Sequence, residues 1–240
     1  MPRFFSENFS ETKTITGEDA HHISKVLRAS VGDEITVCDT KGVDYLCRIA
    51  GINNGEISLD IIEEKKSDSE PDIAITLYQC MPKSDKLETV TQKSIELGVL
   101  RIVPVLSSRC VSRPDPKSAK KKVERLNKIA EAAAKQSGRG IIPEVSDLIS
   151  FDSLLKEIKS HKLSIVFYEL GGAPLRSLIK EGVDDIAIVI GPEGGFSREE
   201  IEKLNAAGAV SATLGKRILR TETAPLAAIS AIMLLSGNLE

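Results

Sequence analysis

Apolar and polar residues alternate in three short runs near the N-terminus: Ile35–Val37, Val43–Ile49 and Ile57–Ile61. A period of two is typical of strands that bury one face. Asn54-Gly55 stands between the second and third runs and predicts a tight hairpin turn, because both residue types accept a positive φ. The three runs are therefore predicted to form antiparallel strands.

The first 70 residues are predicted to form a small β-rich domain. A helix from about Gly17 to Arg28, with Thr16 as its N-cap, is expected before the strands. The domain ends in the polar stretch Lys65–Pro71, which closes with a proline and is the best linker candidate in the chain. We expect the boundary at residue 71.

From residue 72 onward, strand and helix patterns follow one another. Strands are predicted at Ile73–Met81, Arg101–Leu106, Leu163–Leu170, Ile186–Ile190 and Val210–Leu214. Helices are predicted at Ser84–Leu97, Lys117–Ser137, Phe151–Ile158, Arg198–Ala207 and Leu226–Leu235. Because this alternation predicts a parallel sheet, residues 72–240 are expected to form an α/β domain.

The last predicted helix, Leu226–Leu235, is apolar on almost every side. A helix without a polar face is expected to be buried all round. In a chain of 240 residues, burial against a second copy is the simplest solution, so the helix predicts a homodimer.

Composition narrows the class of protein. With 41% hydrophobic and 28% charged residues, the chain resembles ordinary globular proteins. It has no apolar run of roughly 18 residues and no secretory signal at its start, so we expect a cytoplasmic protein without a membrane span. The cysteines and histidines lack metal-ligand spacing, which favours buried thiols and no metal: Cys38, Cys47, Cys80, Cys110, His21, His22 and His161.

Charge is segregated along the chain although the net charge is only −3. Residues 83–139 carry 14 lysines and arginines against 6 aspartates and glutamates, whereas residues 1–70 carry 8 against 14. Such a basic band is typical of an RNA-binding surface, and a solvated helix face is the alternative.

Two loops carry candidate chemistry, and the first is Gly191–Phe196. It follows an apolar strand, and its three glycines allow a ligand to approach the backbone closely. Ser197 and Glu200 form a capping-box pattern that starts the next helix. Phosphate-binding loops favour lysine, whereas this loop contains Glu193, so a cationic cofactor without phosphate, such as S-adenosylmethionine, fits better.

The second loop, Gly215–Ala224, precedes the last helix and mixes three cations with one carboxylate and two threonines. Thr223 is a natural N-cap, because Pro225 then falls in the first helical turn. A solvated connection is the alternative interpretation of this loop.

Together these motifs resemble a known family. Gly191–Ser197 and Leu214–Ala224 resemble the two signature loops of the ribosomal RNA small-subunit methyltransferase E family of the SPOUT superfamily. The family's PUA-like domain is matched by Pro2–Phe5 and His21–Arg28. Its methyltransferase domain is matched by Gln92–Gly98 and Gln136–Arg139.

The resemblance implies a fold and a reaction. The fold is α/β, a SPOUT-type parallel sheet with a C-terminal trefoil knot, preceded by a small PUA-like β-barrel domain. Residues 1–70 would be the PUA-like RNA-binding domain and 72–240 the knotted methyltransferase domain of a homodimer. The reaction is methylation of N3 of one uridine in 16S ribosomal RNA of the small ribosomal subunit, with S-adenosylmethionine and no metal.

Site residues are expected as follows. The cofactor is predicted to bind Leu170, Gly191, Pro192, Glu193, Gly194, Leu214, Gly215, Ile218, Leu219, Arg220, Thr223 and Ala224. Arg220 is predicted to stabilise charge on the uracil, with Glu222 orienting Arg220, accepting the proton or forming a salt bridge within the loop. RNA is predicted to bind Arg3, His22, Lys25, Arg28, Arg109, Arg113, Lys120, Lys121, Lys122 and Arg139.

Other functions remain open. A non-catalytic RNA-binding protein would also use a PUA-like domain and a basic band, but has no reason to keep both signature loops. A SPOUT methyltransferase acting on another RNA is a second alternative. A Rossmann-type oxidoreductase lacks support, because no G-x-G-x-x-G follows a predicted strand.

Overall fold

The computed structural model describes residues 2–53 and 55–239, and the chain divides into two compact units. The first contains the chain up to Glu70 together with Ala134–Ile142, and the second contains Pro71–Ala133 and the chain from Pro143 onward. The segment Ala134–Ile142 thus departs from the expected division at residue 71. Side-chain and backbone bonds account for this, because Arg139 and the Gly140 N–H both bind the Glu70 carboxylate.

The first unit is built on a five-stranded sheet with the order β1-β3-β4-β5-β2. Its strands are β1 (Arg3–Phe5), β2 (Thr14–Thr16), β3 (Glu34–Cys38), β4 (Val43–Asn53) and β5 (Glu56–Lys66). β4 and β5 pair antiparallel, as predicted; Asn54 lies outside the described residues, and Gly55 has φ +88°. β1 and β2 are the edge strands of this sheet. Among the described strands they do not pair with each other, so hydrogen bonding does not close the sheet into the expected barrel.

Alternation along the strands explains the core of this unit. Ile35 and Val37 of β3 and Ile57 and Leu59 of β5 are buried, together with Phe9 of α1 (Phe9–Thr12). The helix expected over residues 17–28 is shorter and irregular, with α2 (Gly17–His21) passing into the π-helical η1 (His22–Val26). Thr16 is the N-cap residue of α2, as predicted, with extended backbone angles, although its side chain accepts no capping hydrogen bond.

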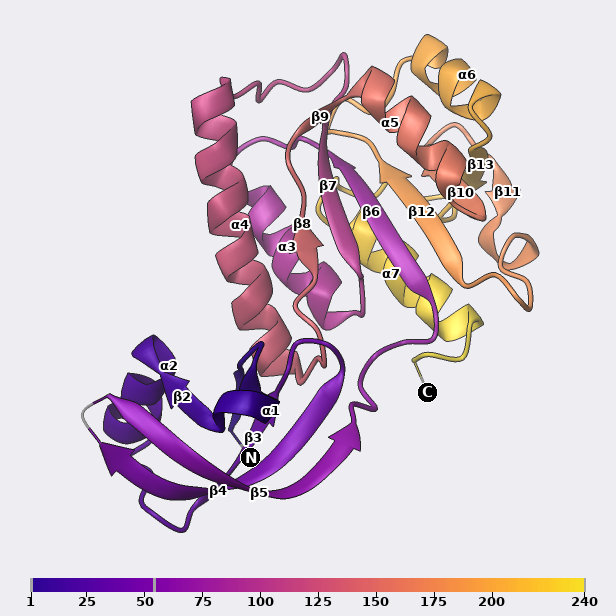
Figure 1. Cartoon of the computed structure of the whole chain (residues 1–240). Helices are drawn as coiled ribbons and strands as arrows, with labels where there is room; N and C mark the ends of the chain where they lie inside the picture. The colour runs from indigo at the N-terminus through magenta and orange to yellow at the C-terminus, as the bar shows by residue number, and fades with distance from the viewer. Residues whose placement is uncertain (1, 54, 240) are drawn as a thin grey trace. The chain divides into compact units, whose positions relative to one another are not determined.

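The second unit is an α/β layer structure whose sheet is parallel throughout, with the order β11-β13-β10-β12-β6-β7-β8 and β9 also paired to β7 (Figure 1). Its strands are β6 (Ala74–Cys80), β7 (Arg101–Leu106), β8 (Glu144–Val145), β9 (Ile149–Ser150), β10 (Leu163–Phe167), β11 (Ala173–Pro174), β12 (Asp185–Ile190) and β13 (Val210–Thr213). The five longer strands confirm the predicted runs, whereas β8, β9 and β11 have two residues each and no detectable period.

Helices connect these strands. They are α3 (Lys86–Glu96), α4 (Pro116–Ser137), α5 (Phe151–Glu157), α6 (Arg198–Ala206) and α7 (Ala224–Leu235), with short 3-10 turns η2 (Ile158–Ser160) and η3 (Leu175–Ser177). Each longer helix lies where the pattern predicted it. Gly98, with φ +95°, follows the C-terminus of α3.

The path near the C-terminus sets up the site. After β13 at the far side of β10, the chain returns to α7, which contacts β12, β6 and α3. On the way it passes the loop after β12, where the Thr221 hydroxyl donates a 2.9 Å hydrogen bond to the Gly191 carbonyl. This crossing is consistent with the trefoil knot of the SPOUT-type fold.

Helix α7 is not buried on every side within one chain. Ala228, Ile229 and Ile232 are fully buried, but Leu234 is 59% exposed and Leu235 is 41% exposed. Within one chain, α3 and the sheet cover one face of the helix and leave another face exposed, so burial all round would require the predicted second copy, which stays a prediction.

Several compositional expectations can be compared directly with the structure. All four cysteines are free and buried, as predicted, and burial raises the pKa of Cys47 to about 11. Across the described residues, no group of three or more His, Cys, Asp and Glu side chains is placed to hold a metal ion. The described helices include none with the length and apolar character that a bilayer crossing requires.

Candidate active site

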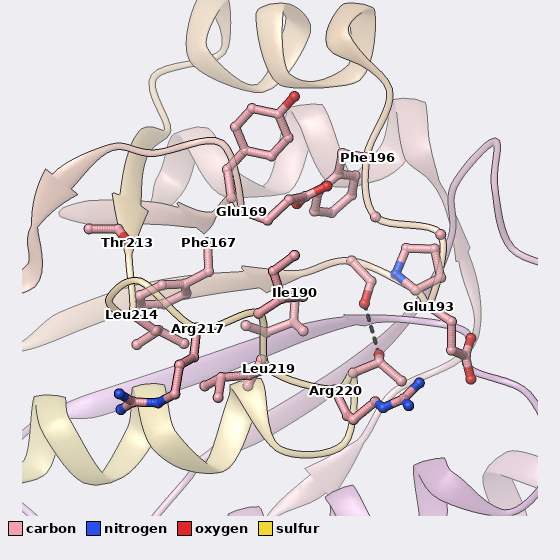
Figure 2. Close-up of a pocket in the computed structure, with 18 of the residues that line it drawn as sticks. Phe167, Glu169, Ile190, Glu193, Phe196, Thr213, Leu214, Arg217, Leu219 and Arg220 are labelled. Atoms are coloured by element: carbon pink, nitrogen blue, oxygen red, sulfur yellow. Dashed lines mark hydrogen bonds between the residues drawn. The ribbon is translucent and has the colours of Figure 1, made fainter.

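A pocket of about 520 Å³ lies at the carboxyl ends of β10, β12 and β13 (Figure 2). Open parallel sheets place ligands at this end of their strands. Three chain segments line the pocket: residues 167–169, 190–196 and 213–221, with Ala224 at the start of α7. The two loops singled out in the sequence therefore meet around one cavity.

The first loop, residues 191–196, is anchored by the start of α6. The Ser197 hydroxyl accepts from the Glu200 N–H at 3.2 Å, and the Glu200 carboxylate accepts from the Ser197 N–H at 2.9 Å, which confirms the predicted capping box. The second oxygen of Glu200 accepts from the Ser108 N–H at 2.7 Å. Glu200 is only 6% exposed, so it fastens the helix start to the segment after β7.

Packing within the protein requires glycine at position 195 of this loop, leaves little room at position 191 and allows ordinary contact at position 194. A Cβ on Gly195, whose φ is +62°, would lie 2.6 Å from a Glu169 carboxylate oxygen. A Cβ on Gly191 would lie 3.2 Å from the Phe196 ring. On Gly194 it would face Arg109, whose guanidinium donates to the Gly194 carbonyl at 2.9 Å. Gly195 thus allows the loop to approach Glu169 closely.

A buried chain of hydrogen bonds connects the second loop to β6 and to the first loop. Gln79, fully buried in β6, donates through Nε2 to the Thr221 hydroxyl at 3.1 Å, and Thr221 donates onward to the Gly191 carbonyl. Both side chains were missed by sequence reasoning. Gln79 had a detectable signal, because it is a polar residue inside the apolar run Ile73–Met81.

Lys86, in the first turn of α3, was also missed and lies between the two loops. Its Nζ is 3.2 Å from Glu193 Oε1 and 3.0 Å from Glu222 Oε2. The Lys83 N–H also donates to Glu193 at 3.0 Å. Interactions with Glu222 and Glu193 raise the pKa of Lys86.

Both carboxyl groups are held in the ionised form. Desolvation opposes this at Glu193, but backbone N–H groups and Lys86 outweigh it and lower the pKa of Glu193. The backbone N–H of Glu222 and the Lys86 ammonium lower the pKa of Glu222, with Arg220 adding a smaller Coulombic effect. Glu193, Glu222 and Lys86 therefore form a cluster of paired, charged groups beside the pocket.

Comparisons with known proteins identify the architecture. An RNA methyltransferase domain model matches residues 69–233, and an RNA methyltransferase PUA domain model matches residues 15–62. The ribosomal RNA small subunit methyltransferase E of Bacillus subtilis is 38% identical over 97% of this chain and 96% of its own. This chain belongs to the ribosomal RNA small subunit methyltransferase E family.

Solved structures agree. A family member from Neisseria gonorrhoeae, bound to S-adenosyl methionine, is 36% identical, with 98% of each chain covered and a TM-score of 0.87. A methyltransferase from Legionella pneumophila in complex with the cofactor SAM is 29% identical, covers 97% of this chain and 96% of its own, and has a TM-score of 0.85.

Most of the residues predicted to bind the cofactor line the pocket in this member of the family. Two do not: Leu170 is 80% exposed beyond the lining, and Thr223 precedes α7. Thr223 has helical backbone angles and makes no side-chain cap, so its predicted capping role was wrong. Lining residues that the sequence prediction omitted are Phe167, Tyr168, Glu169, Ile190, Gly195, Phe196, Thr213, Lys216, Arg217 and Thr221.

The two candidate catalytic side chains are placed differently. Arg220 lines the pocket and is exposed. Figure 2 shows it on the same side as Glu193, with Arg217 on the opposite side. Glu222 forms its ion pair with Lys86 of α3, outside the loop, so the alternative of a salt bridge within the loop was wrong.

The predicted RNA-binding cations fall into three groups: those with side chains open to solvent, those that bind backbone carbonyls and those in ion pairs. His22, Lys25, Arg28, Lys120 and Lys121 are exposed, and Lys122 is half-buried. The guanidinium groups of Arg109 and Arg113 bind backbone carbonyls, so they brace loops beside the site.

Two of the arginines predicted to bind RNA are already engaged in ion pairs. The Arg3 side chain pairs with Asp44, and Arg139, only 3% exposed, pairs with Glu70. These guanidinium groups are committed to ion pairs inside the first unit, and a phosphate could reach them only by displacing a carboxylate.

Proposed function

We propose that this protein transfers a methyl group from S-adenosylmethionine to N3 of a uridine in the ribosomal RNA of the small subunit. The observation that carries the proposal is the pocket formed jointly by the two loops at the carboxyl ends of β10, β12 and β13. Family membership supports the same reaction class, and the relatives are named for small-subunit ribosomal RNA.

The residues present fit this cofactor. Phe167, Ile190 and Leu219 provide apolar walls for an adenine, and the loops offer backbone groups for its polar edge. Glu169 and Glu193 line the pocket together with Lys216, Arg217 and Arg220, so the lining carries both signs of charge and can face the sulfonium and the carboxylate of this cofactor. When bound, S-adenosylmethionine supplies an electrophilic methyl group on a positively charged sulfur.

The protein's own chemistry is assigned to Arg220. N3 of uridine carries a proton and is a poor nucleophile until that proton passes to water, so the negative charge left on the uracil oxygens must be stabilised. The Arg220 guanidinium, exposed at the pocket, can donate two hydrogen bonds to such an oxygen. Glu222 has a lowered pKa and is a weak base near neutral pH, so we assign it to the ion pair with Lys86.

RNA binding is assigned to both units. We assign residues 1–70 as the PUA-like RNA-binding domain, with His22, Lys25 and Arg28 on its surface, and residues 72–240 as the methyltransferase domain. The exposed lysines of α4 complete the proposed surface. We also propose a homodimer formed through the exposed face of α7, in a cytoplasmic protein.

Methylation of assembled small subunits and of free ribosomal RNA, with labelled S-adenosylmethionine and mass mapping of the product, tests this function. We expect one methyluridine modified at N3. Label in a different RNA class would favour the alternative of another RNA substrate. RNA binding without label transfer or cofactor binding would favour a non-catalytic RNA-binding protein.

A further inference from the structure

Glu193, Glu222 and Lys86 form a charged cluster beside the pocket, close enough to Arg220 of the pocket lining for Arg220 to act on Glu222. Glu193 comes from the first loop and Glu222 from the second, and both pair with Lys86 of α3. Arg220 belongs to the second loop, two residues before Glu222, yet among the described residues it forms no ion pair. One lysine outside both loops therefore forms ion pairs with both acids.

We propose that Lys86 is a positioning residue that occupies Glu193 and Glu222 and thereby leaves the Arg220 guanidinium free to bind the substrate base. The inference rests on the proposed function only for the role of Arg220 in methyl transfer. The charge pairing itself is a property of the protein without RNA or cofactor.

The geometry makes Lys86 an effective partner for both acids. Its side chain is 31% exposed, and those of Glu193 and Glu222 are 22% and 32% exposed, so the cluster is partly shielded from water. Coulombic attraction over about 3 Å is stronger in such a setting than between fully exposed groups. The lysine is compact and has three donors, which suits it to two acceptors on different segments.

Arg220 is the natural competitor for these carboxylates. Figure 2 places its side chain on the same side of the pocket as Glu193 and places that of Arg217 on the other side. Guanidinium groups bind carboxylates with two parallel hydrogen bonds, which is their preferred geometry. Arg220 already lowers the pKa of Glu222 through Coulombic attraction, whereas Glu193 keeps its bond from the Lys83 N–H. If Lys86 lost its charge, Glu222 would therefore draw Arg220 into such a pair and away from the base.

Loop position has independent support that does not need Lys86. The buried chain from Gln79 through Thr221 to Gly191 remains, as does the Lys83 N–H bond to Glu193. Removing the Lys86 charge is therefore expected to spare the cofactor cavity and to impair methyl transfer. A loss of methyl transfer without a loss of cofactor binding would show that Lys86 acts by pairing charges and not by supporting the loops.

The test uses the full-length protein with Lys86→Gln, the double variant Lys86→Gln/Glu222→Gln, and Lys93→Gln as a matched loss of charge on the same helix. We expect Lys86→Gln to lower the single-turnover methylation rate by about tenfold or more, because the misplaced guanidinium no longer meets the base. Cofactor affinity by calorimetry should change by less than about threefold, and the double variant should recover most of the rate, since no Glu222 carboxylate competes for Arg220.

A normal rate for Lys86→Gln, or a double variant as slow as Lys86→Gln, would overturn the proposal. A second measurement needs no activity: the hydrogen exchange rate of the Arg220 Nε–H, followed by NMR on the protein alone. We expect slower exchange in Lys86→Gln than in the parent or in Lys93→Gln, and equal exchange overturns the proposal. If the parent protein methylates no RNA, the proposed function fails, and the exchange measurement still decides the role of Lys86.

Discussion

At the scale of single residues, charged side chains at the site differ in what they already bind. Lys86, Glu193 and Glu222 are engaged with one another, and Arg109 holds the first loop through the Gly194 carbonyl. Arg220 lines the pocket without such an ion pair among the described residues. A free guanidinium in a lined cavity is available for a substrate, whereas a paired one mainly organises structure.

Replacing Arg220 with Ala should slow the chemical step. Loss of one preorganised donor to a developing oxyanion typically costs about 10²-fold in rate, and we expect that order here. Single-turnover methylation of small subunits, with cofactor affinity measured in parallel, checks it, and Arg176→Ala serves as a control at an exposed arginine outside the pocket. A near-normal rate for Arg220→Ala would assign charge stabilisation to a different cation.

The Lys86 cluster also predicts a pH dependence. The pKa of Lys86 is raised from its ordinary 10.5, and those of Glu193 and Glu222 are lowered from 4.5. The carboxylate contribution is present above pH 4.5 and lost as pH falls through the lowered values, and the lysine contribution is lost only as pH rises through the raised value. An NMR titration of the Lys86 Cε should give a midpoint above 10.5 that falls in Glu222→Gln. A midpoint at or below 10.5 contradicts the clustered charges.

At the scale of elements, the start of α6 links local sequence to the site. The capping box of Ser197 and Glu200 satisfies backbone donors at the helix N-terminus and also ends the first loop. Glu200 extends the same contact to Ser108. A local capping signal thus fixes where the loop can lie relative to β7.

The variant Ser197→Ala is therefore expected to affect both stability and binding. Loss of an N-cap costs about 1 kcal/mol, and here it should also weaken cofactor binding, because the loop end loses its anchor. Ser150→Ala removes the corresponding cap of α5, where Ser150 accepts from the Ser153 N–H, far along the chain from both loops. The midpoint temperature of thermal unfolding should fall in both variants. Calorimetry should show weaker cofactor binding only in Ser197→Ala. If Ser197→Ala bound the cofactor as tightly as Ser150→Ala, the helix cap would have no role in cofactor binding.

At the scale of the whole molecule, the exposed face of α7 is the main unpartnered apolar feature that the sequence anticipated. Ala227, Ala231 and Leu234 follow one another at helical spacing on this face, and Leu234 is 59% exposed. Burial of such a face between two copies removes apolar surface from water.

Leu234→Glu should convert the dimer to a monomer, because two carboxylates would be buried at the contact. The side chain is exposed in the single chain, so the fold should be retained. Sedimentation at micromolar concentration measures the mass, with Val31→Glu, at a 63% exposed valine of the first unit, as the control. A parent protein that sediments as a monomer would refute the homodimer.

RNA affinity should fall steeply with salt concentration if the lysines of α4 bind phosphates. Replacing Lys120, Lys121 and Lys122 with Gln should reduce the slope of log affinity against log salt by roughly 3, about 1 for each lost contact. The control variant replaces three lysines outside α4 with Gln and so removes the same amount of charge: Lys156, Lys159 and Lys180. An unchanged slope in the α4 variant would identify those lysines as a solvated face.

The sequence by itself determined the elements that depend on local physics. Periodicity located the longer strands and helices, and the capping box and the glycine-rich loop located the start of α6 and one side of the pocket. Short strands such as β8 and β11 were missed, because two residues have no period and exist only through pairing with neighbours.

Only the tertiary structure decided the partners of side chains. The sequence predicted Arg3 and Arg139 as RNA-binding cations, yet each forms an ion pair with a carboxylate distant along the chain. Lys86 carried no sequence signal, since its two acids lie more than 100 residues away and are brought to it by the order of strands. The physical reason is that ion pairs depend on distance in space, which residue spacing along a chain does not encode.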